Sequence, residues 1–109
     1  MPKIIDEFLS IEEHIVLKNL MGSINFPWYF NNGKVKLTEK LFDYQLSHVF
    51  YDDNKINSNH FNNLQPLIKK LNPLSLIRIK ANLNPITNKL VVSEYHQDQN
   101  FKCKAAIYY

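Results

Sequence analysis

Two stretches of the chain alternate between hydrophobic and polar residues, which is the pattern of strands in a half-buried sheet. The first covers residues 42–51, and its two faces carry Phe42, Tyr44, Leu46, His48 and Phe50 against Asp43, Gln45, Ser47, Val49 and Tyr51. The second covers residues 74–83, and its two faces carry Ile77, Ile79, Ala81 and Leu83 against Leu76, Arg78, Lys80 and Asn82. Two further strands are expected at residues 90–98 and 102–109, the later one with Cys103, Ala105, Ile107 and Tyr109 on one face.

Hydrophobic residues at helical spacing predict two helices, one before these strands and one between the first two of them. The first follows a capping box that begins at Ser10 and closes at Glu13, and it extends to about Met21. We expect Gly22 to end it in the left-handed conformation, and its inner face to carry Ile11, Ile15 and Leu20. The second helix carries Phe61, Leu64, Ile68 and Leu71, and Pro66 predicts that it either begins near this residue or is kinked there.

Residues 25–30 combine large apolar side chains with Pro27, which cannot donate to a strand ladder. This combination predicts an edge strand or an irregular extended segment. Trp28, Tyr29 and Phe30 have two interpretations, as a substrate-facing wall or as cover for the core, and the pattern favours the core. Together the elements predict an α+β fold.

Composition narrows the class of protein. At 109 residues with 45% hydrophobic content, the chain predicts one soluble domain at most. The net charge of +3 comes from scattered lysines, which does not indicate a nucleic-acid or membrane surface. The single cysteine, Cys103, excludes an internal disulfide and favours a reducing, cytoplasmic setting.

The candidate chemistry lies at the end of the third predicted strand, in the sequence His96-Gln97-Asp98. Side chains two residues apart in an extended chain project to the same side, so an imidazole and a carboxylate lie together. A further histidine would complete the 2-His-1-carboxylate triad that holds non-heme Fe(II). A polar strand end that turns into a loop explains the same residues without a metal. An unrelated zinc site is disfavoured because no cluster of cysteine or histidine accompanies the pair.

Three other histidines precede the pair. His14 lies in the first turns of the first predicted helix and is expected at the surface. His48 lies on the apolar face of its strand, where a core histidine with satisfied hydrogen bonds is the favoured interpretation. We assign a ligand role to neither of these nor to His60.

The sequence around the pair resembles the Fe(II)- and 2-oxoglutarate-dependent dioxygenases. An apolar strand at residues 74–83 and a turn at Asn84-Pro85 precede His96-x-Asp98, and Ala106-Ile107-Tyr108-Tyr109 follows it, as in the prolyl-4-hydroxylase-like branch with its small bacterial and phage members. The resemblance implies N-terminal helices packed on the first half of a double-stranded β-helix, a jelly-roll or cupin-like sheet. It also implies hydroxylation of a protein or peptide side chain, and the substrate it implies is a protein, a peptide or a small molecule.

The resemblance implies roles for individual residues. His96 and Asp98 would be the metal ligands, with no further catalytic residue, and Tyr109 would hydrogen-bond to 2-oxoglutarate. Arg78, Lys80 and Asn82 would contact 2-oxoglutarate or substrate, or else form an outer, wetted face. The implied cofactors are Fe(II), the cosubstrate 2-oxoglutarate and, as a further candidate, ascorbate.

In the family, the third iron ligand and the basic residue that clamps 2-oxoglutarate follow the position of Tyr109. We therefore expect this chain to be the N-terminal half of such an oxygenase, cut off or naturally truncated, and inactive alone. The alternative is a catalytically inactive binding module that self-associates as a homo-oligomer through an open sheet edge.

Overall fold

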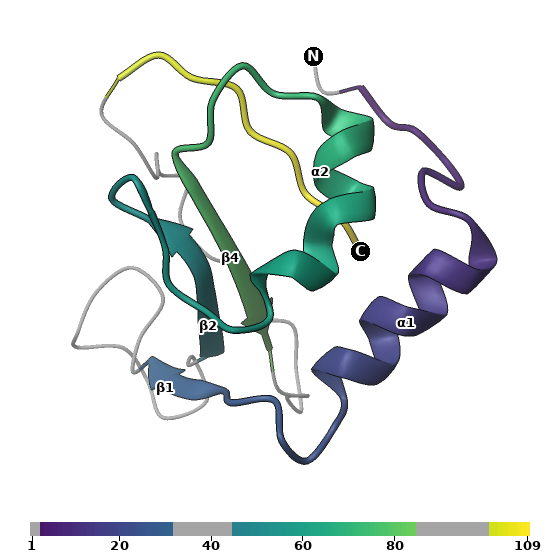
Figure 1. Ribbon diagram of the computed structural model, residues 1–109, viewed down its shortest axis with the longest axis vertical. Helices are drawn as coiled ribbons and strands as arrows, with labels where there is room; N and C mark the ends of the chain where they lie inside the picture. The colour runs from purple at the N-terminus through teal and green to yellow at the C-terminus, as the bar shows by residue number, and fades with distance from the viewer. Residues whose placement is uncertain (1–2, 32–44, 85–100) are drawn as a thin grey trace, which may run out of the picture.

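The computed structural model describes residues 3–31, 45–84 and 101–109, and these form helices packed on an antiparallel sheet (Figure 1). The predicted α+β class is confirmed at this level. The expected strand at residues 90–98, with His96 and Asp98, lies outside the described residues, as do Phe42 and Tyr44. The elements in chain order are α1 (Ile11–Met21), β1 (Tyr29–Asn31), β2 (Gln45–Asp52), β3 (Lys55–Ile56), a 3-10 turn η1 (Phe61–Leu64), α2 (Gln65–Leu71) and β4 (Arg78–Leu83).

Strand β2 lies at the centre of the described sheet. It pairs antiparallel with β4 along one side, and with β1 and β3 at its two ends on the other side. The turn between β2 and β3 consists of Asp53 and Asn54, whose φ angles of 51° and 61° are both positive. Two-residue hairpin loops favour such angles because their twist matches that of the flanking strands.

A bulge at Phe50 breaks the alternation that the sequence predicts for β2. Val49 lies opposite Lys80 and Tyr51 lies opposite Ile79, so Phe50 is an extra residue without a partner on β4. Phe50 is buried, and the Tyr51 ring also lies on the core side, 5.9 Å from the ring of Phe61. The expectation that Tyr51 shares a face with Val49 is therefore wrong.

Strand β4 starts four residues later than predicted. Its ladder begins where Asp52 meets Arg78, and β2 ends at Asp52 because the hairpin turn follows. The four preceding residues have no strand to pair with in the described sheet, and Leu74 is fully exposed. From Arg78 onward the predicted faces are confirmed, because Ile79 and Ala81 pack against the core.

Helix α1 begins with the predicted capping box. The backbone N–H of Glu13 donates to Ser10 Oγ at 3.1 Å, and that of Ser10 donates to Glu13 Oε1 at 3.0 Å. The predicted inner face is wrong for Ile11 and Ile15, which are 76% and 46% exposed, whereas Leu20 packs against the core as predicted, beside the buried Leu17. Gly22 has a φ of −91° and is not left-handed, since a turn in which Ser23 N–H donates to Leu20 O ends the helix.

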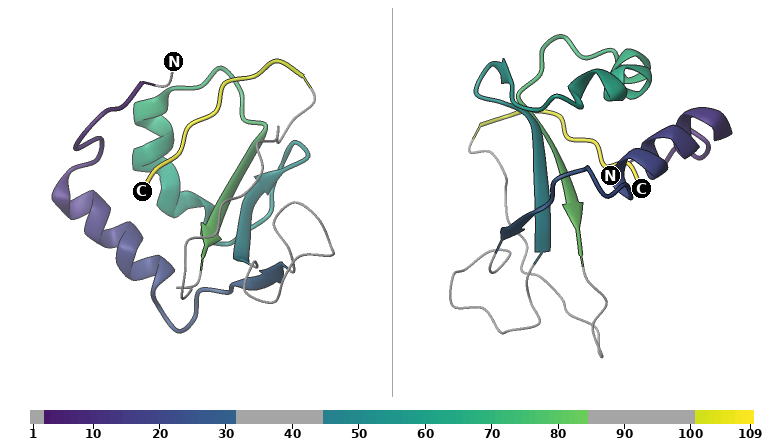
Figure 2. Two further views of the ribbon diagram at one scale, coloured as in Figure 1. Left: turned by 180° about the vertical axis from the view of Figure 1, so that it is seen from behind. Right: turned by 60° about the horizontal axis from the view of Figure 1, so that its bottom comes forward.

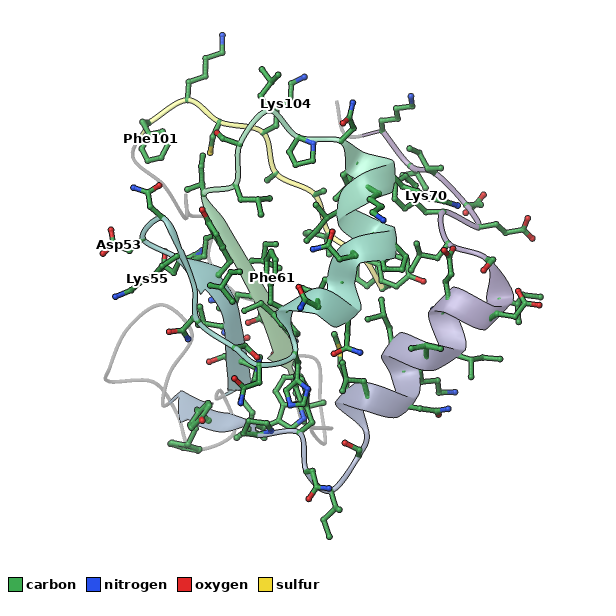
Figure 3. The ribbon with its side chains drawn as sticks, viewed as in Figure 1. Asp53, Lys55, Phe61, Lys70, Phe101 and Lys104 are labelled. Atoms are coloured by element: carbon green, nitrogen blue, oxygen red, sulfur yellow. The ribbon has the colours of Figure 1, made fainter. Side chains whose placement is uncertain are left out.

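Of the two predictions for the second helix, a start near Pro66 is confirmed. The 3-10 turn η1 leads into α2, and Pro66 lies in the first turn of the helix, where its missing N–H is not needed. Asn72 ends the helix with a φ of 49°. Lys70 points from α2 toward the N-terminal segment, where its Nζ donates to Phe8 O at 2.7 Å (Figure 3).

The core lies between the helices and one face of the sheet. The side chain of Phe26 contacts the residues of β2 within this core. The centroid of its ring lies 4.2 Å from that of His48 and 5.9 Å from that of Phe50. Figure 3 shows Phe61 to the side of α2, over β4. The buried apolar residues are Leu9, Leu17, Phe26, Phe50, Phe61 and Leu64.

The predicted strand at residues 102–109 is wrong. Residues 101–109 form no strand and run past α2 to end near α1, as both views in Figure 2 show. Alternation alone does not make a strand, because a ladder needs a neighbouring strand. The segment is held instead by the Tyr108 hydroxyl, whose oxygen is 2.6 Å from His14 Nδ1.

Candidate functional site

The face of the sheet opposite the helices carries the polar residues of β4. Asn82 is opposite Ser47, Lys80 is opposite Val49, and Arg78 is opposite Asp52. Side chains of directly opposite residues share a face of the sheet. We call this surface the polar face; its residues are Tyr29, Ser47, Val49, Asp52, Arg78, Lys80 and Asn82.

A row of three polar side chains crosses the polar face. Ser47 is opposite both Tyr29 of β1 and Asn82 of β4, so the three residues lie side by side on three adjacent strands. Opposite Cβ atoms in such pairs are about 5 Å apart. The row therefore presents a phenol, a hydroxyl and an amide over about 10 Å.

Lys80 and Arg78 are partly buried cations on this face, and their surroundings differ. Arg78 faces the carboxylate-bearing Asp52 across the strands. Lys80 faces Val49, and no described residue forms an ion pair or hydrogen bond with its side chain. The positive charge of Lys80 is thus uncompensated within the described part of the chain.

The structure brings together some of the residues that the sequence singled out and separates others. Arg78, Lys80 and Asn82 share the polar face, whereas His96 and Asp98 lie outside the described residues. Tyr109 is 95% exposed at the end of the C-terminal segment, on the helix side of the sheet (Figure 2). Among residues 3–31, 45–84 and 101–109, no three His, Cys, Asp or Glu side chains are grouped to hold a metal ion.

His48 is a core histidine with both ring nitrogens occupied, as predicted. It is 4% exposed, and its Nδ1 is 2.8 Å from the carbonyl oxygen of Pro27, which accepts only, so Nδ1 carries the proton. The Ser58 hydroxyl therefore donates to Nε2 over 2.7 Å. Ser58 Oγ in turn accepts the backbone N–H of His60 at 3.1 Å. Because both nitrogens are committed, His48 is excluded as a metal ligand in this conformation.

His14 is not a free surface residue. It is partly buried, and its ring centroid lies 5.8 Å from that of Tyr108 in addition to the 2.6 Å contact between Nδ1 and the hydroxyl. This contact tethers the C-terminal segment to α1, so the predicted surface position is only partly correct.

The structure separates the three aromatic residues that sequence analysis treated together. Trp28 packs against the core and its Nε1–H donates to Met21 O at 3.1 Å, so core cover is confirmed for this residue. Tyr29 is 62% exposed and points to the polar face, while Phe30 is 64% exposed and lies opposite Leu46 on the other face. Sequence reasoning missed the pairing of Tyr29 with Ser47, which depends on strand register.

Comparison of the chain with protein-family models, with curated proteins and with solved structures gives no significant match. Within the described residues, no helix has the length and apolar character needed to cross a membrane.

Proposed function

We propose that this chain carries the first half of an Fe(II)- and 2-oxoglutarate-dependent hydroxylase that acts on a protein or peptide side chain. The observation that carries the proposal is the sequence His96-x-Asp98 followed by Ala106-Ile107-Tyr108-Tyr109, after a strand with polar residues on one face. An antiparallel sheet with helices on one face and polar residues on the other is compatible with the first half of a double-stranded β-helix.

The donor set at the motif suits iron. An imidazole nitrogen and a carboxylate oxygen are two of the three protein ligands in a 2-His-1-carboxylate site. When bound, iron would activate O2, which supplies one oxygen atom to hydroxylate a C–H bond and the other to 2-oxoglutarate as it is oxidised to succinate and carbon dioxide. His96 must be neutral and Asp98 ionised to bind, so protons compete with the metal in acid.

The polar face would serve the anionic cosubstrate or the substrate. Lys80 is a partly buried cation with no carboxylate partner among the described residues, so it is suited to hold a carboxylate. Asn82 is two residues further along the same strand and adds an amide that both donates and accepts. These residues would bind and orient; none is assigned a proton transfer.

Metal binding tests the proposal. The sequence contains no histidine after His96, so we expect weak binding of Fe(II), with the metal lost on desalting and no turnover. Mn(II) is the practical probe because it does not oxidise in air. Its binding is measured by electron paramagnetic resonance in the presence of 2-oxoglutarate. His96→Ala or Asp98→Ala should weaken binding by about tenfold or more.

The control is Asp53→Asn, which removes a carboxylate from the tip of the β2–β3 hairpin (Figure 3). It should leave Mn(II) binding unchanged. Equal binding by wild type, His96→Ala and Asp98→Ala would contradict the proposal. A chain that binds no metal but self-associates would favour the inactive binding module, and stoichiometric Fe(II) retained through desalting would refute the expectation of weak binding.

A further inference from the structure

The side chain of Tyr29 is exposed on the polar face and is not needed to hold β1 in place. It is the first residue of the short strand β1, and no hydrogen bond or ring contact joins its side chain to another described residue. The neighbouring Trp28 packs against the core, so it anchors this part of the chain without help from Tyr29. The phenol of Tyr29, 62% exposed, is therefore available to a ligand on the polar face.

The row formed by Tyr29, Ser47 and Asn82 matches the length of a short extended peptide segment. Its length of about 10 Å equals about three residues of extended chain at roughly 3.3 Å each. Each of its three side chains can both donate and accept a hydrogen bond, so they can pair with the N–H and C=O groups of a chain that crosses them. The row offers hydrogen-bonding groups, which favours a polar segment.

Charge decides which polar segment fits. Lys80 lies two positions from Asn82 on the same face of β4, so this lysine is the next residue to the row on that face. Arg78 lies opposite the carboxylate-bearing Asp52 in the strand register, whereas Lys80 has no carboxylate partner among the described residues. A segment lying on the row thus meets one uncompensated positive charge, which favours an acidic residue in the segment.

We propose that Tyr29, Ser47 and Asn82, with Lys80 beside them, bind an extended acidic peptide segment. This inference rests on the proposed function, because it names the class of substrate for that site. It adds β1 to the site and assigns Tyr29 as a residue that contacts the substrate. Substitutions of two polar residues on different strands, Tyr29 and Lys80, should then weaken binding of the same ligand.

The test is fluorescence anisotropy with the full 109-residue chain, without metal or 2-oxoglutarate. The probe is a labelled peptide of alternating Glu and Ser around a central Pro, compared with versions in which Gln or Lys replaces Glu. We expect the acidic peptide to bind about fivefold or more tightly than the Gln version. Tyr29→Ala and Lys80→Gln should each weaken its binding by about three- to tenfold.

Matched controls separate the site from general effects. Phe30→Ala removes an aromatic residue of similar exposure from the other face of β1, and Lys55→Gln removes a lysine at the hairpin tip (Figure 3). Both should change binding by less than about twofold. Circular dichroism shows whether each variant is folded, and Tyr29→Phe provides a second, milder probe of the phenol.

Equal affinity for the three peptides, or equal losses in Tyr29→Ala and Phe30→Ala, would overturn the inference. The Mn(II) experiment on His96 and Asp98 separates this failure from that of the proposed function. If the chain binds metal but does not prefer the acidic peptide, the proposed hydroxylase function stands and the proposed acidic substrate is refuted. If the chain binds no metal but binds the peptide in a way that depends on Tyr29, the proposed peptide site stands and the proposed oxygenase function is refuted.

Discussion

Replacing Ser58 by alanine should destabilise the fold far more than its position in a connecting segment suggests. The hydroxyl of Ser58 donates to Nε2 of His48 at 2.7 Å, and its oxygen accepts the backbone N–H of His60 at 3.1 Å. Ser58→Ala removes both interactions. The lost partner of His48 matters most, because this ring is 4% exposed and its Nε2 would be left without a hydrogen bond.

The expected loss follows from the burial of that nitrogen. A buried polar group left without a partner costs about 1–3 kcal/mol, and the lost acceptor of His60 N–H is less costly because this residue is only partly buried. We therefore expect the free energy of unfolding to fall by about 2 kcal/mol, out of roughly 5–15 kcal/mol for a domain of this size. The midpoint of thermal unfolding should drop by about 8–15 °C.

Urea unfolding followed by circular dichroism measures this change. Ser75→Ala, at an exposed serine before β4, is the matched control and should change the free energy by less than about 0.5 kcal/mol. A double-mutant cycle with His48→Phe isolates the contact, because the loss caused by Ser58→Ala should shrink when the imidazole is gone. If Ser58→Ala unfolds at the same urea concentration as the wild type, the role assigned to this hydrogen bond is refuted.

Three further predictions concern local stability. Ser10→Ala should cost about 1 kcal/mol through loss of the helix cap. The backbone N–H of Ser10 lowers the pKa of Glu13 below its ordinary 4.5, so the capping contribution of this carboxylate is present above its unfolded pKa and is lost as pH falls through its folded pKa. The stabilities of wild type and Glu13→Gln should accordingly converge in acid, and a gap that stays constant with pH would contradict this. Leu64→Ala, at a residue 2% exposed, should cost about 2–5 kcal/mol in urea unfolding, whereas the fully exposed Leu74→Ala should be almost neutral, and similar losses would refute the core assignment.

Signals confined to a few neighbouring residues were predictable from the sequence. The capping box at Ser10 and Glu13 depends on atoms three residues apart, and the start of α2 depends on the missing N–H of Pro66. The faces of β4 from Arg78 onward follow from the two-residue period of a strand. The burial of His48 follows from its aromatic neighbours on the same face.

The candidate site was predictable only in part. Arg78, Lys80 and Asn82 were placed on one face by the strand period. Their alignment with Ser47 and Tyr29 depends on the register between β1, β2 and β4, because a shift of one residue would move every side chain to the other face. Register is a property of pairing between distant segments, so the pattern within one strand does not define it.

The sequence by itself determined where most helices and strands occur and which residues of β4 share a face, because these features depend on local hydrogen bonds and on periodicity. The tertiary structure alone decided that α1 contacts the core through Leu17 and not through Ile11 and Ile15, and that Phe50 forms a bulge. It also decided that β4 begins at Arg78, where its partner begins, and that Tyr108 meets His14. Each of these depends on surfaces brought together by folding, and a strand or a buried face exists only where a neighbour is present to pair with it or cover it.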